Sequence, residues 1–364
     1  MEYSFHIQDP TDENTLYIFE AIVRQVANER LESWRGIYAF ATGSAVRSLF
    51  VEDPLVSKFA RTGQVSIIVG LDAVTDVSAL QELKRLSEEY RQFEAKVFFN
   101  PNTRLFHPKI SHFRQTDGVS ILVVGSGNLT RGGLRTNIEA YSVVIGTDGE
   151  LASLSIWDEF IERHRANIRD IDDEAFEKAR QNRVTRRAIP PRIVEAEPEE
   201  PPPAEEEDLE EEETALVNSR VLVARVPAAG GRWHQIHLNA AVVSEFFRIK
   251  PNSEQRLFLR EVQQDGTAES EEVRPLVYSV VNKNYKIEVS ARRGADYPER
   301  SNPPILVFRE LGLRSFRYML IMPNEEGYEA MLELTERLPP LGKGTRRVLT
   351  NYEQIKAVWA NCPL

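Results

Sequence analysis

The chain has 364 residues, of which 41% are hydrophobic and 9% aromatic, and a formal net charge of -11, values typical of a soluble globular protein long enough for two domains. No apolar run approaches the roughly 18 residues that cross a bilayer, the first ten residues do not form a signal peptide, and we expect a cytoplasmic protein. The single cysteine, Cys362, excludes a disulfide framework, a thiolate zinc site and an iron–sulfur cluster within one chain.

The first part of the chain alternates helical and strand patterns. Apolar residues at helical spacing predict helices, at 12–32, after Gly43, at 77–93, at 151–166 and at 176–187. Apolar runs and alternation predict strands, at 36–42, 65–71, 95–100, 105–113, 120–126 and 139–146. Strands that alternate with helices indicate an α/β domain, here 1–187, with a mixed sheet covered by helices on both faces.

An acidic, proline-rich segment follows at 188–214. Residues 195–213 hold eleven glutamates, one aspartate and no basic residue. Removing these twelve charges from the net charge of -11 leaves +1 for the rest, so a local basic cleft is compatible with the composition. The segment cannot bury enough apolar surface to fold, which predicts an extended linker.

The last part of the chain, 215–364, is rich in β patterns. Seven short runs predict strands, at 219–226, 234–238, 255–262, 275–281, 285–291, 304–311 and 316–322. Helical patterns occur only around 240–248, 326–338 and 351–359. This order predicts a β-rich domain built as a barrel-like pseudobarrel with peripheral helices.

Residues 106–140 bring together five polar side chains of different chemistry. His107 and Lys109 lie two apart on a predicted strand, so they project from one face. The next predicted strand runs into a Gly-rich turn that holds Ser126 and Asn128, and Glu139 follows. If the two strands are neighbours, the hydroxyl and the amide reach the same place as the imidazole and the ammonium.

Each of these groups suits attack on a phosphodiester. An imidazole serves as nucleophile or proton donor, and an ammonium stabilises charge on phosphate oxygens. A hydroxyl and an amide orient those oxygens, and a carboxylate can fix the imidazole tautomer. Taken singly, each feature has an ordinary explanation: His107 as a core or surface histidine, the Gly-Ser-Gly-Asn segment as a hairpin turn, and Glu139 as a solvated charge. His112, five residues after His107, points to the opposite face and is expected to be structural.

The order and spacing of these residues resemble the phospholipase D superfamily, and in particular its nuclease branch. The matching signature is His-x-Lys, then Gly-Ser-x-Asn, then a Glu eleven residues after Asn128. Many members carry an Asp five residues after the Lys, where this chain has Arg114, so members without that Asp are the better match. No role is carried onto Asp117.

The resemblance implies a homodimer and a metal-independent reaction. In that superfamily two His-x-Lys motifs form one centre, in which one histidine attacks phosphorus and the other protonates the leaving oxygen. This chain has one such motif, so the centre would lie on a two-fold axis between two first domains. The implied catalytic residues are His107, Lys109, Ser126, Asn128 and Glu139, with no metal and no cofactor in this chain.

The last domain supplies a candidate DNA reader. Arg, Asn, Gln and Lys are the side chains that contact base edges or phosphates, although hairpin tips are often rich in Asn and Lys. Two polar segments resemble the two arms of the B3 DNA-binding domain in position. The candidate DNA-binding residues are Arg232, Trp233, His234, Gln235, Asn282, Lys283, Asn284, Tyr285 and Lys286, with Arg292 and Arg293 as further phosphate contacts.

A phospholipase D-like domain, an acidic linker and a B3-like domain, in this order, resemble the BfiI- and CglI-type restriction endonucleases. Some relatives act alone and others need a helicase-like ATPase subunit; the chain length and acidic linker favour the second kind. "GKGT" at 342–345 is no P-loop, because Arg337 stands where the first glycine is needed and Gly344 where Ser or Thr is needed. ATP would therefore be used by a partner.

Several alternatives stay open. The chain could be a superfamily phosphodiesterase that acts on lipids or nucleotides, or a DNA-binding protein that does not cleave. The acidic linker could occupy the catalytic cleft as a DNA mimic, or it could be a solvated spacer. The recognition sequence and the cut positions do not follow from the sequence.

Overall fold

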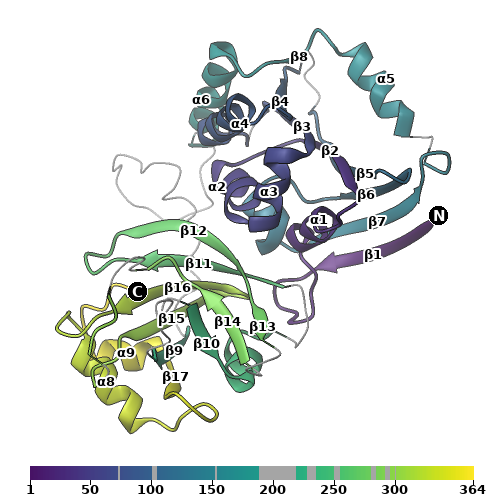
Figure 1. Ribbon diagram of the computed structural model, residues 1–364. Helices are drawn as coiled ribbons and strands as arrows, with labels where there is room; N and C mark the ends of the chain where they lie inside the picture. Colours follow the sequence, from purple (N-terminus) through teal and green to yellow (C-terminus); the bar gives the residue numbers. More distant parts are fainter. Residues whose placement is uncertain are drawn as a thin grey trace. The chain divides into compact units, whose positions relative to one another are not determined.

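The computed structural model describes residues 1–72, 74–100, 105–151, 154–187, 219–227, 235–249, 255–279, 284–291, 296–299 and 301–364. The chain forms two compact units, Met1–Glu205 and Glu206–Leu364 (Figure 1). The linker predicted at 188–214 lies outside the described residues. No helix in the described ranges is long and apolar enough to cross a membrane.

The first unit is built on an eight-stranded mixed sheet. The sequence predicts a mixed sheet, with six of these strands; β1 and β8 are additional. The strand order is β1-β7-β6-β5-β2-β3-β4-β8. β2, β3 and β4 are parallel, and the other neighbouring pairs are antiparallel. The strands are β1 (Glu2–Gln8), β2 (Leu31–Tyr38), β3 (Gln64–Gly70), β4 (Phe93–Phe98), β5 (Lys109–Gln115), β6 (Val119–Gly125), β7 (Glu139–Thr147) and β8 (Ile168–Arg169).

Helices pack on both faces of this sheet. On one face Trp34 of β2 stacks on Phe50, with ring centroids 4.9 Å apart; on the other, Ile37 packs in a cluster with Trp157 and Phe160. Figure 1 shows α1, α2 and α3 together on one side of the sheet and α5 apart from them. The helices are α1 (Ile18–Val26), α2 (Gly43–Arg47), the π-helix η1 (Ser48–Glu52), α3 (Pro54–Thr62), α4 (Val77–Glu89), the π-helix η2 (Gly132–Thr136), α5 (Ser155–Arg163) and α6 (Asp173–Arg187).

Two features near the N-terminus differ from the sequence-based expectation. The helix predicted at 12–32 extends only over Ile18–Val26. Upstream of it the Asp12 carboxylate accepts the backbone N–H of Asn14 at 2.9 Å, so an Asx turn replaces helical hydrogen bonds. Strand β1 was not predicted, because its alternating apolar residues face solvent, with Tyr3 81% and Phe5 67% exposed.

The second unit contains two sheets rather than one barrel. The described strands form a six-stranded sheet, β12-β11-β16-β15-β9-β17, and a three-stranded sheet, β10-β14-β13, without closure. Each of the seven predicted runs contains a strand, and β12 and β17 are additional. The strands are β9 (Arg220–Arg225), β10 (Gln235–Leu238), β11 (Arg256–Val262), β12 (Ala268–Pro275), β13 (Val277–Ser279), β14 (Asn284–Glu288), β15 (Ile305–Gly312), β16 (Ser315–Ile321) and β17 (Arg347–Asn351).

Two apolar clusters cover the two faces of the six-stranded sheet. One cluster joins Phe308 of β15 to Ile236 and Ile287 of the three-stranded sheet and to the π-helix η5 (Val242–Phe246). The other joins the opposite face of β15 to Met331 of α8 (Tyr328–Arg337) and Ile355 of α9 (Tyr352–Val358). All three helices lie where the sequence predicts helical segments.

Candidate active site

The predicted catalytic side chains meet at one edge of the first sheet. β6 runs antiparallel to β5 and β7, so the end of β6 and the beginnings of β5 and β7 lie together. Lys109 begins β5, Glu139 begins β7, and Ser126 directly follows β6. The Ser126 N–H donates to the Ala140 carbonyl at 2.9 Å. The condition that the two strands be neighbours is therefore met.

Lys109 fixes the imidazole of His107. Its Nζ lies 2.9 Å from Nδ1 and 3.1 Å from the carbonyl oxygen of His107. An ammonium has donors only, so both atoms of His107 act as acceptors. The Phe40 ring lies edge-on to the imidazole, with centroids 5.4 Å apart, and Lys109 Nζ is 5.9 Å from its centre. His107 is exposed, whereas Lys109 is 92% buried beside it.

The electrostatics of this pair favour a neutral imidazole. Burial, and then the Lys109 charge, lower the pKa of His107 from its usual 6.5. Burial lowers the pKa of Lys109, and the Glu139 carboxylate opposes that shift. Because the ammonium donates to Nδ1, the neutral ring of His107 carries its proton on Nε2.

Ser126 and Glu139 form a second pair beside the first. The Ser126 hydroxyl donates to Glu139 Oε2 and accepts the Ala140 N–H at 3.0 Å. Asn137 Nδ2 donates to Glu139 Oε1 at 3.4 Å. The sequence suggested a carboxylate behind the imidazole, but within this chain Lys109 takes that place and the Glu139 carboxylate orients the serine hydroxyl.

Asn128 is held by its backbone rather than by the other four side chains. The adjacent Leu129 N–H donates to the Phe40 carbonyl at 3.1 Å, which ties the turn to the segment that contacts His107. A Cβ on Gly133 would lie 2.3 Å from the Asn128 nitrogen, so this approach requires glycine. Asn128 Oδ1 is buried and has no hydrogen-bond partner among the described residues.

Gln8, at the end of β1, is a supporting residue that the sequence interpretation missed. Its side chain is fully buried. Nε2 donates to the carbonyls of Asn137 at 2.9 Å and Gly133 at 3.4 Å, and Oε1 accepts the Ile18 N–H at 2.9 Å. One amide thus joins β1, α1 and the loop between Asn128 and Glu139. The alternation in "EYSFHIQ" was the signal that could have revealed this strand.

Replacing Gln8 by Leu should lower the free energy of unfolding by about 2–3 kcal/mol, because buried carbonyls and an N–H lose their partner. Urea denaturation would measure this effect. Gln25→Leu on α1 is the matched control, since among the described residues its amide donates only to the Ala21 carbonyl, at 3.3 Å, and is partly exposed. Equal losses for the two variants would contradict the role given to Gln8.

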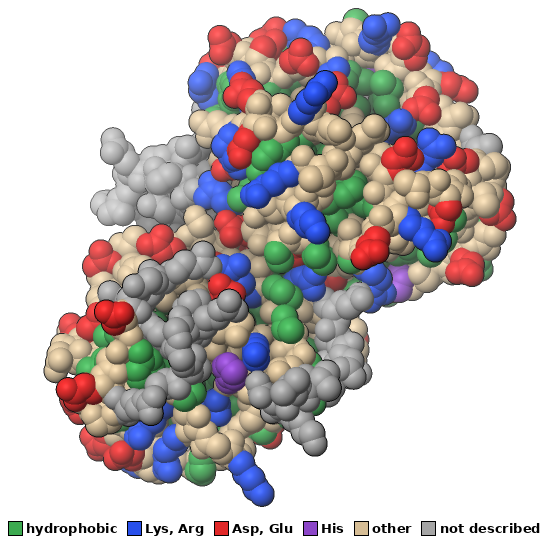
Figure 2. Space-filling view, viewed as in Figure 1, with side chains coloured by type: hydrophobic (Ala, Val, Ile, Leu, Met, Phe, Trp, Pro, Cys, Tyr) green, Lys and Arg blue, Asp and Glu red, His purple; other side chains and the backbone are tan. Residues whose placement is uncertain are grey.

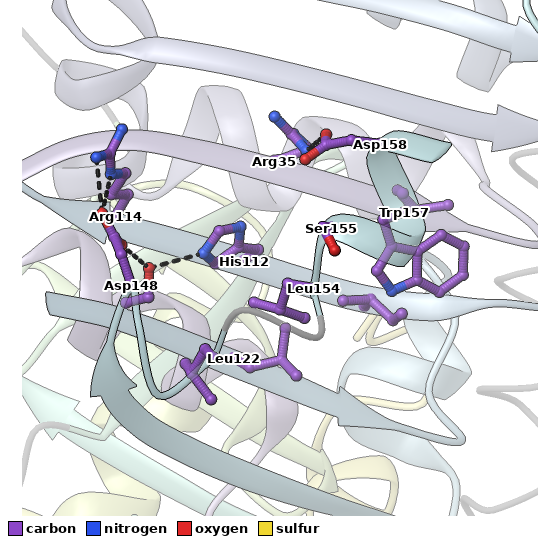
Figure 3. Close-up of a pocket in the computed structure, with 13 residues that line it drawn as sticks. Arg35, His112, Arg114, Leu122, Asp148, Leu154, Ser155, Trp157 and Asp158 are labelled. Atoms are coloured by element: carbon purple, nitrogen blue, oxygen red, sulfur yellow. Dashed lines mark hydrogen bonds and ion pairs between the residues drawn. The ribbon is translucent and has the colours of Figure 1, made fainter. Parts of the chain in front are cut away.

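The opposite face of β5 carries a different constellation. His112 Nε2 lies 3.0 Å from Ser120 Oγ, which donates to Asp148 at 2.9 Å, and Arg114 pairs with Asp148 at 2.7 Å. These residues line a cavity of about 260 Å³ that also contacts Trp157 (Figure 3). His112 is therefore separated from His107 by the sheet, as its spacing predicts. Asp117 pairs with Arg30 and also lies outside the site.

Four candidate DNA-binding residues fall within the described part of the second unit. Gln235, Asn284 and Lys286 lie on β10 and β14 with partly exposed side chains. Tyr285 does not fit its predicted role, because it is 94% buried in the core and packs against Tyr278 with ring centroids 5.0 Å apart. The remaining candidates, Arg232, Trp233, His234, Asn282, Lys283, Arg292 and Arg293, lie outside the described residues.

The described surface offers no group of His, Cys, Asp and Glu side chains suited to hold a metal ion. In the first unit, acidic and basic side chains are interspersed on the face shown in Figure 2.

No family model matches the chain, and no curated protein has a similar sequence. Among solved structures, the chain is similar to NucT from Helicobacter pylori at 12% identity and a TM-score of 0.32, over 46% of this chain and 98% of NucT. The chain is also similar to the phospholipase D family member Nuc from Salmonella typhimurium, at 15% identity and a TM-score of 0.32, over 46% of this chain and 97% of Nuc. A third similar structure is the N-terminal domain of Helicobacter pylori LlaJI.R1, at 10% identity and a TM-score of 0.27, over 36% of this chain and 97% of that domain. At these scores the functional conclusion rests on the residues of the site alone.

Proposed function

We propose that the first unit is a metal-independent phosphodiesterase of the phospholipase D type that cleaves DNA through a phosphohistidine. The observation that carries this proposal is the contact of Lys109 with His107 at the strand edge where Ser126 meets Glu139. A neutral imidazole, an ammonium and an oriented hydroxyl are the groups that phosphoryl transfer without a metal requires.

The substrate phosphate would itself activate the nucleophile. At rest, Lys109 occupies Nδ1 of His107, so the free nitrogen Nε2 carries the proton. When a phosphodiester enters, the ammonium moves to its non-bridging oxygens and releases Nδ1. The ring proton then resides on Nδ1, and the Nε2 lone pair attacks phosphorus. Ser126 and Asn128 orient the oxygens, while Glu139 holds the serine hydroxyl.

The reaction needs a second imidazole, which a homodimer through the first unit supplies. One His107 attacks as the neutral imidazole, while the partner's His107 enters the reaction as an imidazolium. As the Nε2–P bond forms, the P–O bond breaks, and that imidazolium protonates the leaving oxygen and becomes neutral. The partner's His107 then takes a proton from water, which attacks phosphorus and breaks the P–Nε2 bond. Both histidines return to their starting protonation states, and the proposed reaction uses no metal or other cofactor in this chain.

The second unit would give this nuclease its sequence specificity. Gln235, Asn284 and Lys286 present polar groups of the kind that contact bases and phosphates. A two-fold nuclease with an attached DNA reader fits a restriction endonuclease that acts on double-stranded DNA. We extend the proposal to a separate helicase or ATPase subunit, which would use any ATP that the system requires.

Two other functions compete with this proposal. The same centre could hydrolyse phosphodiesters other than DNA, and the chain could bind DNA without cutting it. The contacts among His107, Lys109, Ser126 and Glu139 favour a working centre over a vestigial one, because each side chain is held by another member of the set.

Incubation of the pure protein with supercoiled plasmid in EDTA separates these functions. We expect nicked or linear plasmid, either directly or, in magnesium, only after ATP and a co-encoded ATPase subunit are added. Hydrolysis of bis(p-nitrophenyl) phosphate with intact plasmid in every condition would favour the other phosphodiesterase. Retarded but uncut DNA under all conditions would favour the non-cleaving protein.

A further inference from the structure

We propose that the turn at Gly342–Gly344 is a phosphate contact of the second unit, which binds the backbone of duplex DNA next to the open face of the three-stranded sheet. This inference rests on the proposed function, because it takes DNA as the substrate. It assigns Lys343 as a DNA contact and adds His237 to the surface that faces the duplex.

The three-stranded sheet has one buried and one open face. Ile236 and Ile287 point into the core, 98% and 99% buried. Their strand neighbours point the other way, and His237 pairs in register with Lys286. Asn284 Nδ2 lies 2.9 Å from His237 Nδ1, so the polar side chains of β10 and β14 are linked across the strands.

The Asn239 side chain, on the same face as Gln235 and His237, binds the turn to the end of this open face. Asn239 directly follows β10 and continues the alternation of Gln235 and His237. Its Nδ2 donates to the carbonyls of Leu341 at 3.0 Å and Lys343 at 3.2 Å. Its Oδ1 accepts the Val242 N–H at 2.9 Å, which fixes the orientation of the amide.

A buried arginine fastens the other end of the turn. Arg347 is 95% buried and donates both to the His237 carbonyl and to the Thr345 carbonyl, the latter at 2.9 Å. One guanidinium therefore spans from β10 to the turn. Together with Asn239 it engages the carbonyl of Lys343 in the turn and those of the flanking residues Leu341 and Thr345.

Within the turn the Lys343 carbonyl is engaged by Asn239, while backbone N–H groups are left without a partner in the described part of the chain. Gly342 and Gly344 have φ angles of +77° and +97°, which side chains other than glycine rarely adopt. Lys343 between them is exposed, and the N–H groups of 342–344 have no acceptor among the described residues. Outward N–H groups around an ammonium make an anion site.

The surroundings of the turn select an extended polyanion over an enclosed nucleotide. A P-loop leads into a helix whose N-terminus surrounds the phosphates, whereas this turn leads into strand β17. Lys286 adds a second cation on the adjoining open face. Two cations beside a row of polar side chains match a phosphate backbone whose bases lie over the sheet.

The test measures how binding depends on salt. A labelled random-sequence duplex is titrated with the full-length His107→Ala protein, which cannot cut it, between about 50 and 200 mM salt. Adding Lys343→Gln should weaken binding for every sequence and lower the slope of log K against log salt by about 0.9, one phosphate contact. ATP and inorganic phosphate should compete only through their ionic strength.

Lys356→Gln is the matched control. Lys356 is an exposed lysine on α9, which packs on the other face of the six-stranded sheet. Its slope should equal that of the parent, and urea midpoints should be unchanged in both variants. A duplex bound with equal slopes by the Lys343 and Lys356 variants would overturn this inference and leave the nuclease intact. Failure of the parent to bind any duplex would overturn the proposed function together with it.

Discussion

His107→Ala should lower the rate of plasmid cleavage by at least about 10⁴-fold, because it removes both the proposed nucleophile and the proposed acid of the two-fold centre that we propose. Single-turnover cleavage in EDTA measures this rate. His112→Ala is the matched control, since His112 contacts Ser120 on the opposite face of the sheet, and its variant should cleave at close to the normal rate. Cleavage by the pure protein, without ATP or a partner subunit, that disappears in EDTA would contradict the phosphohistidine mechanism.

Subunit mixing tests the proposed dimer. Wild-type and His107→Ala chains refolded together in equal amounts should pair at random. About one quarter of the dimers then contain two His107 side chains, whereas one half of all chains carry His107. Activity near one quarter of the wild-type value supports a shared centre, whereas activity near one half means that each chain cleaves alone.

Lys109→Met should lower the cleavage rate by about 10²–10³-fold, because the phosphate oxygens lose a charged donor in a buried site. It should also move the acidic limb of the pH–rate profile upward. After burial, the Lys109 charge is the second cause that lowers the pKa of His107. Without that charge the protonated imidazole is less disfavoured, so the pKa rises toward 6.5 and the neutral form appears at higher pH.

Rates measured between about pH 5 and 8 test this shift. Lys96→Met on β4 is a suitable control, because Lys96 pairs with Glu94 at 2.8 Å and lies on another strand. Its profile should coincide with that of the wild type. A Lys109 variant that is slow but keeps an unmoved acidic limb would show that Lys109 acts on the phosphate alone.

The meeting of the candidate catalytic residues was predictable from the sequence for a geometric reason. Period-two alternation places His107 and Lys109 on one face, and antiparallel pairing brings the end of the next strand to the same edge. Both statements depend only on local pattern and on strands that follow each other closely. The seven strand runs and three helical segments predicted in the second unit agree with the structure for the same reason.

The partners within the site were not predictable in this way. Which atom faces Nδ1 of His107 depends on rotamers and on burial, and Lys109 occupies it where the sequence suggested a carboxylate. Tyr285 was misassigned because β14 begins at Asn284, so consecutive side chains of the presumed tip point to opposite faces. Gln8 was missed because its partners lie far along the chain, where no local pattern records them.

The Gln8 hydrogen bonds bear on the order in which the parts of the first sheet come together during synthesis. Its hydrogen bond to Asn137 joins residues 129 positions apart, and contacts of such long range form late, after the loop-closure entropy has been offset. A growing chain that has released only β1 to β5 carries His107 and Lys109 without the loop that holds Asn128 and Glu139. The proposed centre is therefore incomplete in a nascent chain until β6 and β7 have emerged and Gln8 can bind the carbonyl of Asn137.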